Sequence, residues 1–228
     1  MNYVSTRGSA PKLGFEGVLL AGLASDGGLY VPESWPQARV EGASYAEVAA
    51  SITHPFVGGD ISIDVYRKLC EAAYSSFRHP DVAPLVEVAP DHYLLELFHG
   101  PTLAFKDVAL QLVGRMFDHV LGERGERVTI VGATSGDTGS AVAQAFFGVP
   151  RTRVVVLYPE GLVSAVQEAQ FTTLGGNVTL GGSLAGHGFL ELGTVDLGAS
   201  TRTLTVSSPQ SVVTFAGRPV ESTGVRVT

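Results

Sequence analysis

The chain has 228 residues, with 22 Asp and Glu against 15 Lys and Arg, so its formal net charge is −7 and its pI is about 5.3. This acidity argues against a nucleic-acid partner held through phosphate contacts. Hydrophobic residues make up 45% and charged residues 16%, a balance that suits a folded chain with an apolar core. No apolar stretch is long enough for a membrane helix or a signal peptide, so we expect a cytoplasmic protein without a membrane partner.

The first 92 residues read as a small region of mixed secondary structure. Asp26-Gly27-Gly28 is a turn signal, and residues 29–31 after it are typical of a short strand. Helices are predicted over 45–52 and 64–77, the second with its apolar residues on one face. Cys70 lies in that second helix. As the lone cysteine it excludes an intrachain disulfide, and we expect a packed side chain rather than a reactive thiol.

A regular alternation of strands and helices follows from Tyr93 onward. A strand is predicted over 93–98, then a helix that Thr102 caps and Gly122 closes. The next segments read as a buried strand, a loop, a short helix and a second buried strand, over 127–131, 132–139, 140–147 and 153–158. Strand, helix, strand at this spacing is a βαβ unit of a parallel sheet. The predicted class is therefore α/β.

The loop between the first of these strands and its helix is rich in glycine and hydroxyl side chains. A helix N-terminus after a strand favours an anion, which here would be a phosphate or a carboxylate. The glycines are spaced G-x3-G-x2-G, which is neither the dinucleotide fingerprint nor a P-loop, and no lysine follows Gly139. NAD and ATP are therefore disfavoured. The alternative is a turn with a purely topological role.

Lys106 is unusual because apolar residues surround it at the start of a predicted helix. Desolvation would raise the neutral fraction of its amine, as a covalent nucleophile requires. The competing interpretation is a solvated surface pair with Asp107, which is the commoner arrangement on a helix. The six histidines include no closely spaced ligand pair, so we expect no metal site. No G-x-S-x-G elbow is present, which disfavours a hydrolase.

Two motifs carry a resemblance to a known family. The run LELFHGPTLAFKD at 95–107 resembles the lysine motif of threonine synthases, and GATSGDTGSA at 132–141 resembles their second signature. The N-terminal runs YVSTRG at 3–8 and LAGLASDGGLYVPE at 20–33 also resemble the small leading domain of that family.

The resemblance implies a pyridoxal phosphate (PLP) enzyme of fold-type II. Such an enzyme converts O-phospho-L-homoserine and water into L-threonine and phosphate. Lys106 would be the Schiff-base lysine, both catalytic and cofactor-binding, and it would move protons at Cα and Cβ of the substrate. The substrate carboxylate would lie at the loop residues Thr134, Ser135, Gly136, Asp137 and Thr138.

The resemblance ends near Val178, although threonine synthases are much longer. In that family the following part completes the sheet domain and grips the cofactor phosphate. We expect three segments: an N-terminal region at 1–92, a partial PLP-binding α/β domain at 93–178, and a divergent tail at 179–228. The tail holds β-prone pieces at 204–206 and 211–215 but no amphipathic helix, and it suggests a shifted reading frame, a truncated product or disorder. The alternative function is an inactive fragment or an anion-binding module.

Overall fold

A computed structural model describes residues 1–134, 136–158 and 163–178, and beyond them the backbone of five strands within 178–227. The fold is α/β, as the sequence predicts. The chain divides into two compact units, Met1–Glu123 and Arg124–Thr228, each described by itself. The division into three segments that the sequence suggests, with boundaries after residues 92 and 178, remains a proposal.

The first unit begins with a small antiparallel sheet. Its strands are β1 (Asn2–Ser5), β2 (Leu13–Gly14) and β3 (Tyr30–Pro32), in the order β2-β1-β3, and α1 (Phe15–Ala21) follows β2. The turn signal at Asp26 works through its carboxylate. Asp26 accepts hydrogen bonds from the Ser5 hydroxyl at 2.7 Å and from the backbone amides of Ser9, Ala10 and Gly28 at 2.9 to 3.0 Å. One side chain thus ties the ends of the sheet's connecting loops together.

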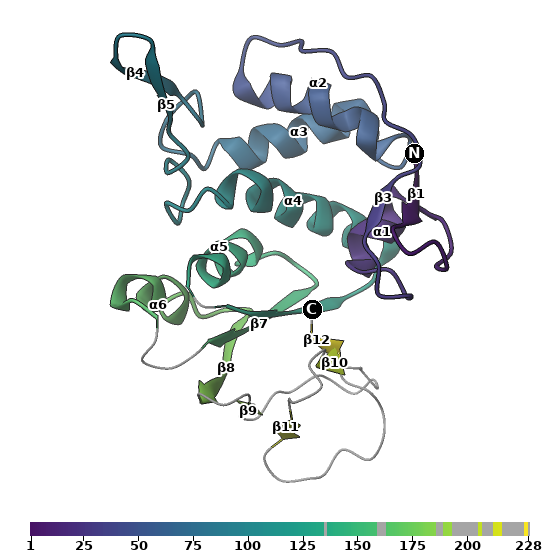
Figure 1. Ribbon diagram of the computed structural model, residues 1–228, viewed down its shortest axis with the longest axis vertical. Helices are drawn as coiled ribbons and strands as arrows, with labels where there is room; N and C mark the ends of the chain where they lie inside the picture. Colours follow the sequence, from purple (N-terminus) through teal and green to yellow (C-terminus); the bar gives the residue numbers. More distant parts are fainter. Residues whose placement is uncertain are drawn as a thin grey trace. The chain divides into compact units, whose positions relative to one another are not determined.

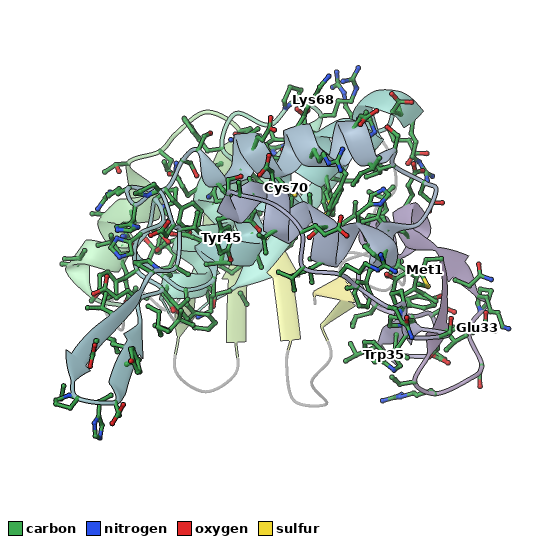
Figure 2. All side chains as sticks on the ribbon, turned by 90° about the horizontal axis from the view of Figure 1, so that it is seen from above. Met1, Glu33, Trp35, Tyr45, Lys68 and Cys70 are labelled. Atoms are coloured by element: carbon green, nitrogen blue, oxygen red, sulfur yellow. The ribbon has the colours of Figure 1, made fainter. Side chains whose placement is uncertain are left out.

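Three helices form the core of the first unit: α2 (Tyr45–Val57), α3 (Ile63–Tyr74) and α4 (Asp107–Arg124). Figure 1 shows α2 and α3 lying side by side. The buried residues between the three helices are mostly apolar and include Ala50, Val57, Ile61, Tyr66, Cys70, Ala73, Leu112, Met116 and Val120. Figure 2 shows Cys70 inside this helical layer, in agreement with the predicted packed role.

The helix boundaries differ from the predicted ones for local reasons. Ser44 caps α2 in a capping box with Glu47, and the helix continues past the predicted end at Ile52, through Pro55, to Val57. The cap predicted at Thr102 is wrong, because α4 begins only at Asp107. Gly122 does not close α4 either. The helix runs to Arg124, and Gly125 follows with a φ of +64°, which suits glycine.

An antiparallel hairpin precedes α4, formed by β4 (Leu85–Ala89) and β5 (His92–Leu95). It projects from the helices of its unit in both views (Figures 1 and 2). The strand predicted over 93–98 is therefore shorter than expected, and residues 96–99 lie outside it. Both strands are exposed along their whole length, so the apolar run there does not mark a buried strand.

The second unit contains the predicted βαβ arrangement. Strands β6 (Val128–Ala133), β7 (Thr152–Tyr158) and β8 (Val178–Ala185) are parallel neighbours. Helices α5 (Asp137–Phe146) and α6 (Ala165–Thr172) lie side by side on one face of this sheet (Figure 1). Helix α5 starts at Asp137, three residues earlier than predicted, and Gly136 is its N-cap. The expected parallel-sheet domain is thus present.

The tail adds short strands to the second unit. Strand β9 (Phe189–Leu192) pairs antiparallel with β8, and β11 (Val212–Phe215) pairs parallel with β9, giving the sheet order β11-β9-β8-β7-β6. Strands β10 (Thr205–Val206) and β12 (Arg226–Val227) form a separate parallel pair. The two β-prone pieces predicted at 204–206 and 211–215 are therefore strands in the structure. The hypotheses of a shifted reading frame, a truncated product and disorder concern residues that lie largely outside the described part.

Candidate functional site

Asp107 organises the segment that leads into Lys106. Its side chain is fully buried, and its two carboxylate oxygens accept hydrogen bonds from the Thr102 amide at 2.7 Å and the Thr102 hydroxyl at 2.8 Å. The Leu103 amide donates a further bond to the same carboxylate. Burial raises the pKa of Asp107, and these three donors partly offset that effect. A surface pair between Lys106 and Asp107 is thus excluded, because Asp107 points inward at the preceding turn.

The turn around this carboxylate has little space and an unusual backbone. A Cβ added at Gly100 would overlap the side chain of Asp107 and lie 2.8 Å from its Cγ, so only glycine fits. Leu103 has a φ of +67°, in the left-handed region that a leucine rarely adopts. The Leu103 amide also bonds to the Gly100 carbonyl at 3.2 Å. The carboxylate of Asp107 therefore holds a strained turn in place.

Lys106 lies between this turn and the first residue of α4. Its side chain is half-buried, and its Nζ lies 4.3 Å from the centroid of the exposed Phe105 ring, a cation–π distance. Its carbonyl accepts the Leu110 amide at 2.9 Å, so the backbone of Lys106 is already joined to the helix. The lysine is thus neither fully desolvated nor a freely solvated surface side chain.

The second predicted segment forms a tight loop at the N-terminus of α5. The Thr134 hydroxyl oxygen accepts hydrogen bonds from the Gly136 amide at 3.1 Å and from the Gly139 amide at 2.9 Å. A Cβ at Gly139 would collide with the Thr134 side chain, coming within 3.0 Å of its Cβ. Thr134 is buried and therefore shapes the loop from inside.

The same loop is braced by α6. Gly136 has a φ of +157°, and a Cβ there would lie 2.7 Å from the Gln167 Oε1. The Ser140 hydroxyl donates to the Gln167 carbonyl at 3.2 Å. Gly136 supplies no side-chain cap, and a helix N-terminus of this kind can bind an anion through its backbone amides. These contacts with α6 help to fix the positions of Gly136 and Ser140.

The predicted site residues fall into two groups. Thr134, Gly136, Asp137 and Thr138 come together at the start of α5, with Asp137 half-buried and Thr138 exposed. Ser135 lies outside the described residues. Lys106 belongs to the first unit and this loop to the second.

The sequence analysis did not predict several polar contacts and buried polar groups. Asp107 looked like a surface residue because a charged pair on a helix usually is one, and no local signal marks its inward turn. Gln111, on α4, is 4% exposed, and its Nε2 has no hydrogen-bond partner among the described residues. His99 Nε2 lies 2.7 Å from Glu96 Oε2 in a partly buried pair. Such contacts depend on the fold and carry no short sequence pattern.

A cavity of about 520 Å³ lies among α2, α3 and α4. Its lining is mainly apolar and includes Val48, Ile52, Leu112, Val113 and Met116. Within the described part of the chain, no three His, Cys, Asp or Glu side chains gather as a metal ion would need. None of the helices described there has the length and apolarity to cross a membrane.

Known proteins match this chain along most of its length. Residues 2–74 match a family model described as the threonine synthase N terminus. A threonine synthase from Pseudomonas aeruginosa is 52% identical over 185 residues, covering 78% of this chain and 39% of that protein. One from Schizosaccharomyces pombe is 41% identical over 189 residues, covering 76% and 37%. The chain therefore spans about two fifths of the length of these relatives.

Solved structures agree with these matches. A PLP-bound threonine synthase from Brucella melitensis superposes with a TM-score of 0.75 at 50% identity, covering 84% of this chain and 41% of that one. Yeast threonine synthase gives a TM-score of 0.73 at 39% identity, covering 80% and 40%. The matches relate this chain to the N-terminal part of the threonine synthase family, as the motifs around Lys106 and Thr134 led us to expect.

Proposed function

We propose that this chain provides the lysine-bearing part of a threonine synthase, which converts O-phospho-L-homoserine and water into L-threonine and phosphate. The observation that carries the proposal is the similarity, at 50% identity, to a structure of a PLP-bound threonine synthase, together with the clamped turn before Lys106. The partner is then a small molecule. The same proposal puts the chain in the cytoplasm.

The described residues fit pyridoxal phosphate in two respects. The half-buried amine of Lys106 can hold the aldehyde carbon of the cofactor covalently. Gln111, one turn beyond Asp107 on α4, offers a buried amide donor that has no partner among the described residues. When bound, the cofactor supplies an electron sink for carbanions next to the substrate nitrogen.

The remaining steps belong to side chains of this chain. Lys106, once its amine is released by the substrate, takes and returns protons at Cα and Cβ of the substrate, so that phosphate can leave from Cγ. The loop from Thr134 to Thr138 binds the substrate carboxylate through backbone amides and hydroxyls at the positive end of the α5 dipole. In this assignment Thr134 shapes the loop, since its hydroxyl already accepts two amides, and the ligand contacts are assigned to Ser135, Gly136, Asp137 and Thr138.

A second candidate is an anion-binding module without turnover. The observation that favours it is the length of the relatives, since this chain spans about two fifths of them. The loop at α5 is closed by contacts within its own unit, so it does not depend on Lys106 for its shape. Carboxylate or phosphate binding would then persist without cofactor chemistry.

Titration of the purified chain with pyridoxal phosphate tests the first proposal. We expect a saturable visible absorbance band that disappears in Lys106→Ala, persists in the exposed control Lys68→Ala, and is trapped on Lys106 by borohydride. A band of equal size in Lys106→Ala would contradict the assignment. No band in the unaltered chain, together with saturable phosphate binding, would favour the anion-binding module.

A further inference from the structure

We infer that Asp107 is a positioning residue, whose carboxylate clamps the turn over residues 100–105 and thereby fixes where the amine of Lys106 is presented. Asp107 itself touches neither substrate nor cofactor in this assignment. The inference deepens the proposed function and rests on it where cofactor capture is the readout.

The first support is the completeness of the clamp. Three donors from two consecutive residues converge on one fully buried carboxylate, at 2.7 Å and 2.8 Å for the two Thr102 bonds. A buried carboxylate that stabilised only α4 would not need hydrogen bonds to the turn that precedes the helix. All its named bonds instead go to Thr102 and Leu103, just upstream of Lys106.

The second support is that neighbouring residues are shaped for this contact. Gly100 leaves the space that the Asp107 side chain fills, and any other residue there would overlap it. Leu103 holds a φ of +67°, a conformation that persists only when surrounding contacts fix it. The strained turn and the buried carboxylate thus depend on each other.

The third support is the direct connection to the lysine. Lys106 and Asp107 are consecutive, and the Asp107 amide bonds to the Ala104 carbonyl at 3.0 Å. Backbone bonds on both sides therefore leave Lys106 little freedom while the clamp holds. Releasing the carboxylate would let the segment from Gly100 to Lys106 move relative to α4, which matters because reacting groups must be held within a fraction of an ångström.

Because Asp107 acts by holding the turn in place, we expect Asp107→Asn and Asp107→Ala to behave differently. In Asp107→Asn the amide oxygen can accept the Thr102 amide, and the amide nitrogen can donate to the Thr102 hydroxyl, whose oxygen also accepts. Both Thr102 contacts are thus kept without the charge. Asp107→Ala removes all of them, and Gly100→Ala displaces the carboxylate by overlap.

The experiment measures the full-length chain in two ways. Reductive methylation with formaldehyde, followed by peptide mass analysis, reports the accessibility of Lys106 relative to the exposed Lys68. Absorbance titration reports the affinity for pyridoxal phosphate. Gly122→Ala is the matched control, because a Cβ there meets nothing within 4 Å. Thr102→Val is a milder second variant that removes one hydrogen bond and keeps the fold if Asp107→Ala does not.

We expect opposite changes in the two readouts. In Asp107→Ala and Gly100→Ala, Lys106 should be methylated at least about threefold faster. The same variants should bind pyridoxal phosphate about tenfold more weakly. Thr102→Val should change both in the same directions by less, while Asp107→Asn and Gly122→Ala stay near the unaltered chain. Loss of affinity in Asp107→Asn equal to that in Asp107→Ala would overturn the inference in favour of a charge effect. Unchanged methylation in the Ala and Val variants would overturn it entirely. If the unaltered chain shows no Lys106-dependent band, the proposed function fails for this chain while methylation still decides the inference.

Discussion

At the scale of single residues, Asp26 links the stability of the N-terminal sheet to pH. The Ser5 hydroxyl and then three backbone amides lower the pKa of Asp26 from 3.8 to about 2. A carboxyl whose pKa is depressed in the folded state stabilises the fold above its unfolded pKa, and this stabilisation is lost as the pH falls from about 4 toward 2. We expect Asp26→Asn to lower the urea midpoint at pH 7 and to flatten its decline over that range. An unchanged slope would contradict this.

Cys70 illustrates a buried group without a chemical role. The side chain is fully buried, and burial raises the pKa of the thiol to about 11. We expect it to react with a thiol reagent at pH 8 only on unfolding, so the labelling rate should track the urea transition. Cys70→Ser should cost about 1–3 kcal/mol by burying a hydroxyl, and more than Cys70→Ala. Rapid labelling of the folded chain would contradict this packed role.

The candidate site shows which functional residues can be predicted from the sequence and which cannot. The lysine and the glycine-rich loop lie in long sequence motifs, so the sequence alone was enough to propose their residues as a site. Asp107 was misread, because its orientation depends on the space left by Gly100 and on the left-handed Leu103, which no local pattern reveals. The partnerless Gln111 was missed for the same reason. Roles that depend on contacts between residues thus require the structure.

At the scale of elements, Asn177 joins three parts of the second unit. Its Nδ2 donates to the Phe146 carbonyl at 2.9 Å and to the Thr152 carbonyl and hydroxyl at 3.2 Å, and its Oδ1 accepts the Gly148 amide at 2.9 Å. The end of α5, the start of β7 and the residue before β8 are thereby tied together. We expect Asn177→Ala to lower the free energy of unfolding by about 1–3 kcal/mol. Asn177→Asp should cost more, since a charge would face two carbonyls; equal stability of both variants and the unaltered chain in urea would refute this.

Element types were easier to predict than their ends. The buried strands and the helix of the βαβ unit follow from apolar periodicity, which the sheet and its helices require. The helix ends were harder to predict. Helix α4 begins at Asp107 instead of directly after Thr102, and α5 begins after Gly136 instead of at Ser140. The hairpin was predicted in part only, because exposed strands with apolar residues look like buried ones.

At the scale of the whole molecule, the exposed apolar surface of the β4–β5 hairpin affects behaviour in solution. Large apolar side chains are at least a third exposed along both strands: Leu85, Val86, Val88, Tyr93, Leu94 and Leu95. Surfaces of this kind promote association. We expect light scattering to show a mass that rises with concentration. Replacing the cross-strand pair Leu85 and Leu95 with threonine should reduce that rise. If the double variant shows the same rise in mass as the unaltered chain, the hairpin is not the surface that associates.

The order of contacts along the chain also has a consequence for biosynthesis. Helices α2 and α3, like strands β4 and β5, follow each other directly, so the first unit gains much of its structure from near neighbours. In the second unit, the parallel pairs β6–β7 and β7–β8 can form only after a whole crossover helix has been made, since Val128 pairs with Thr152 and Val154 pairs with Val178. Low contact order favours rapid folding, and the N-terminal unit also leaves the ribosome first. The segment that carries Lys106 is therefore expected to acquire its native turn during synthesis, before the second unit has completed its sheet.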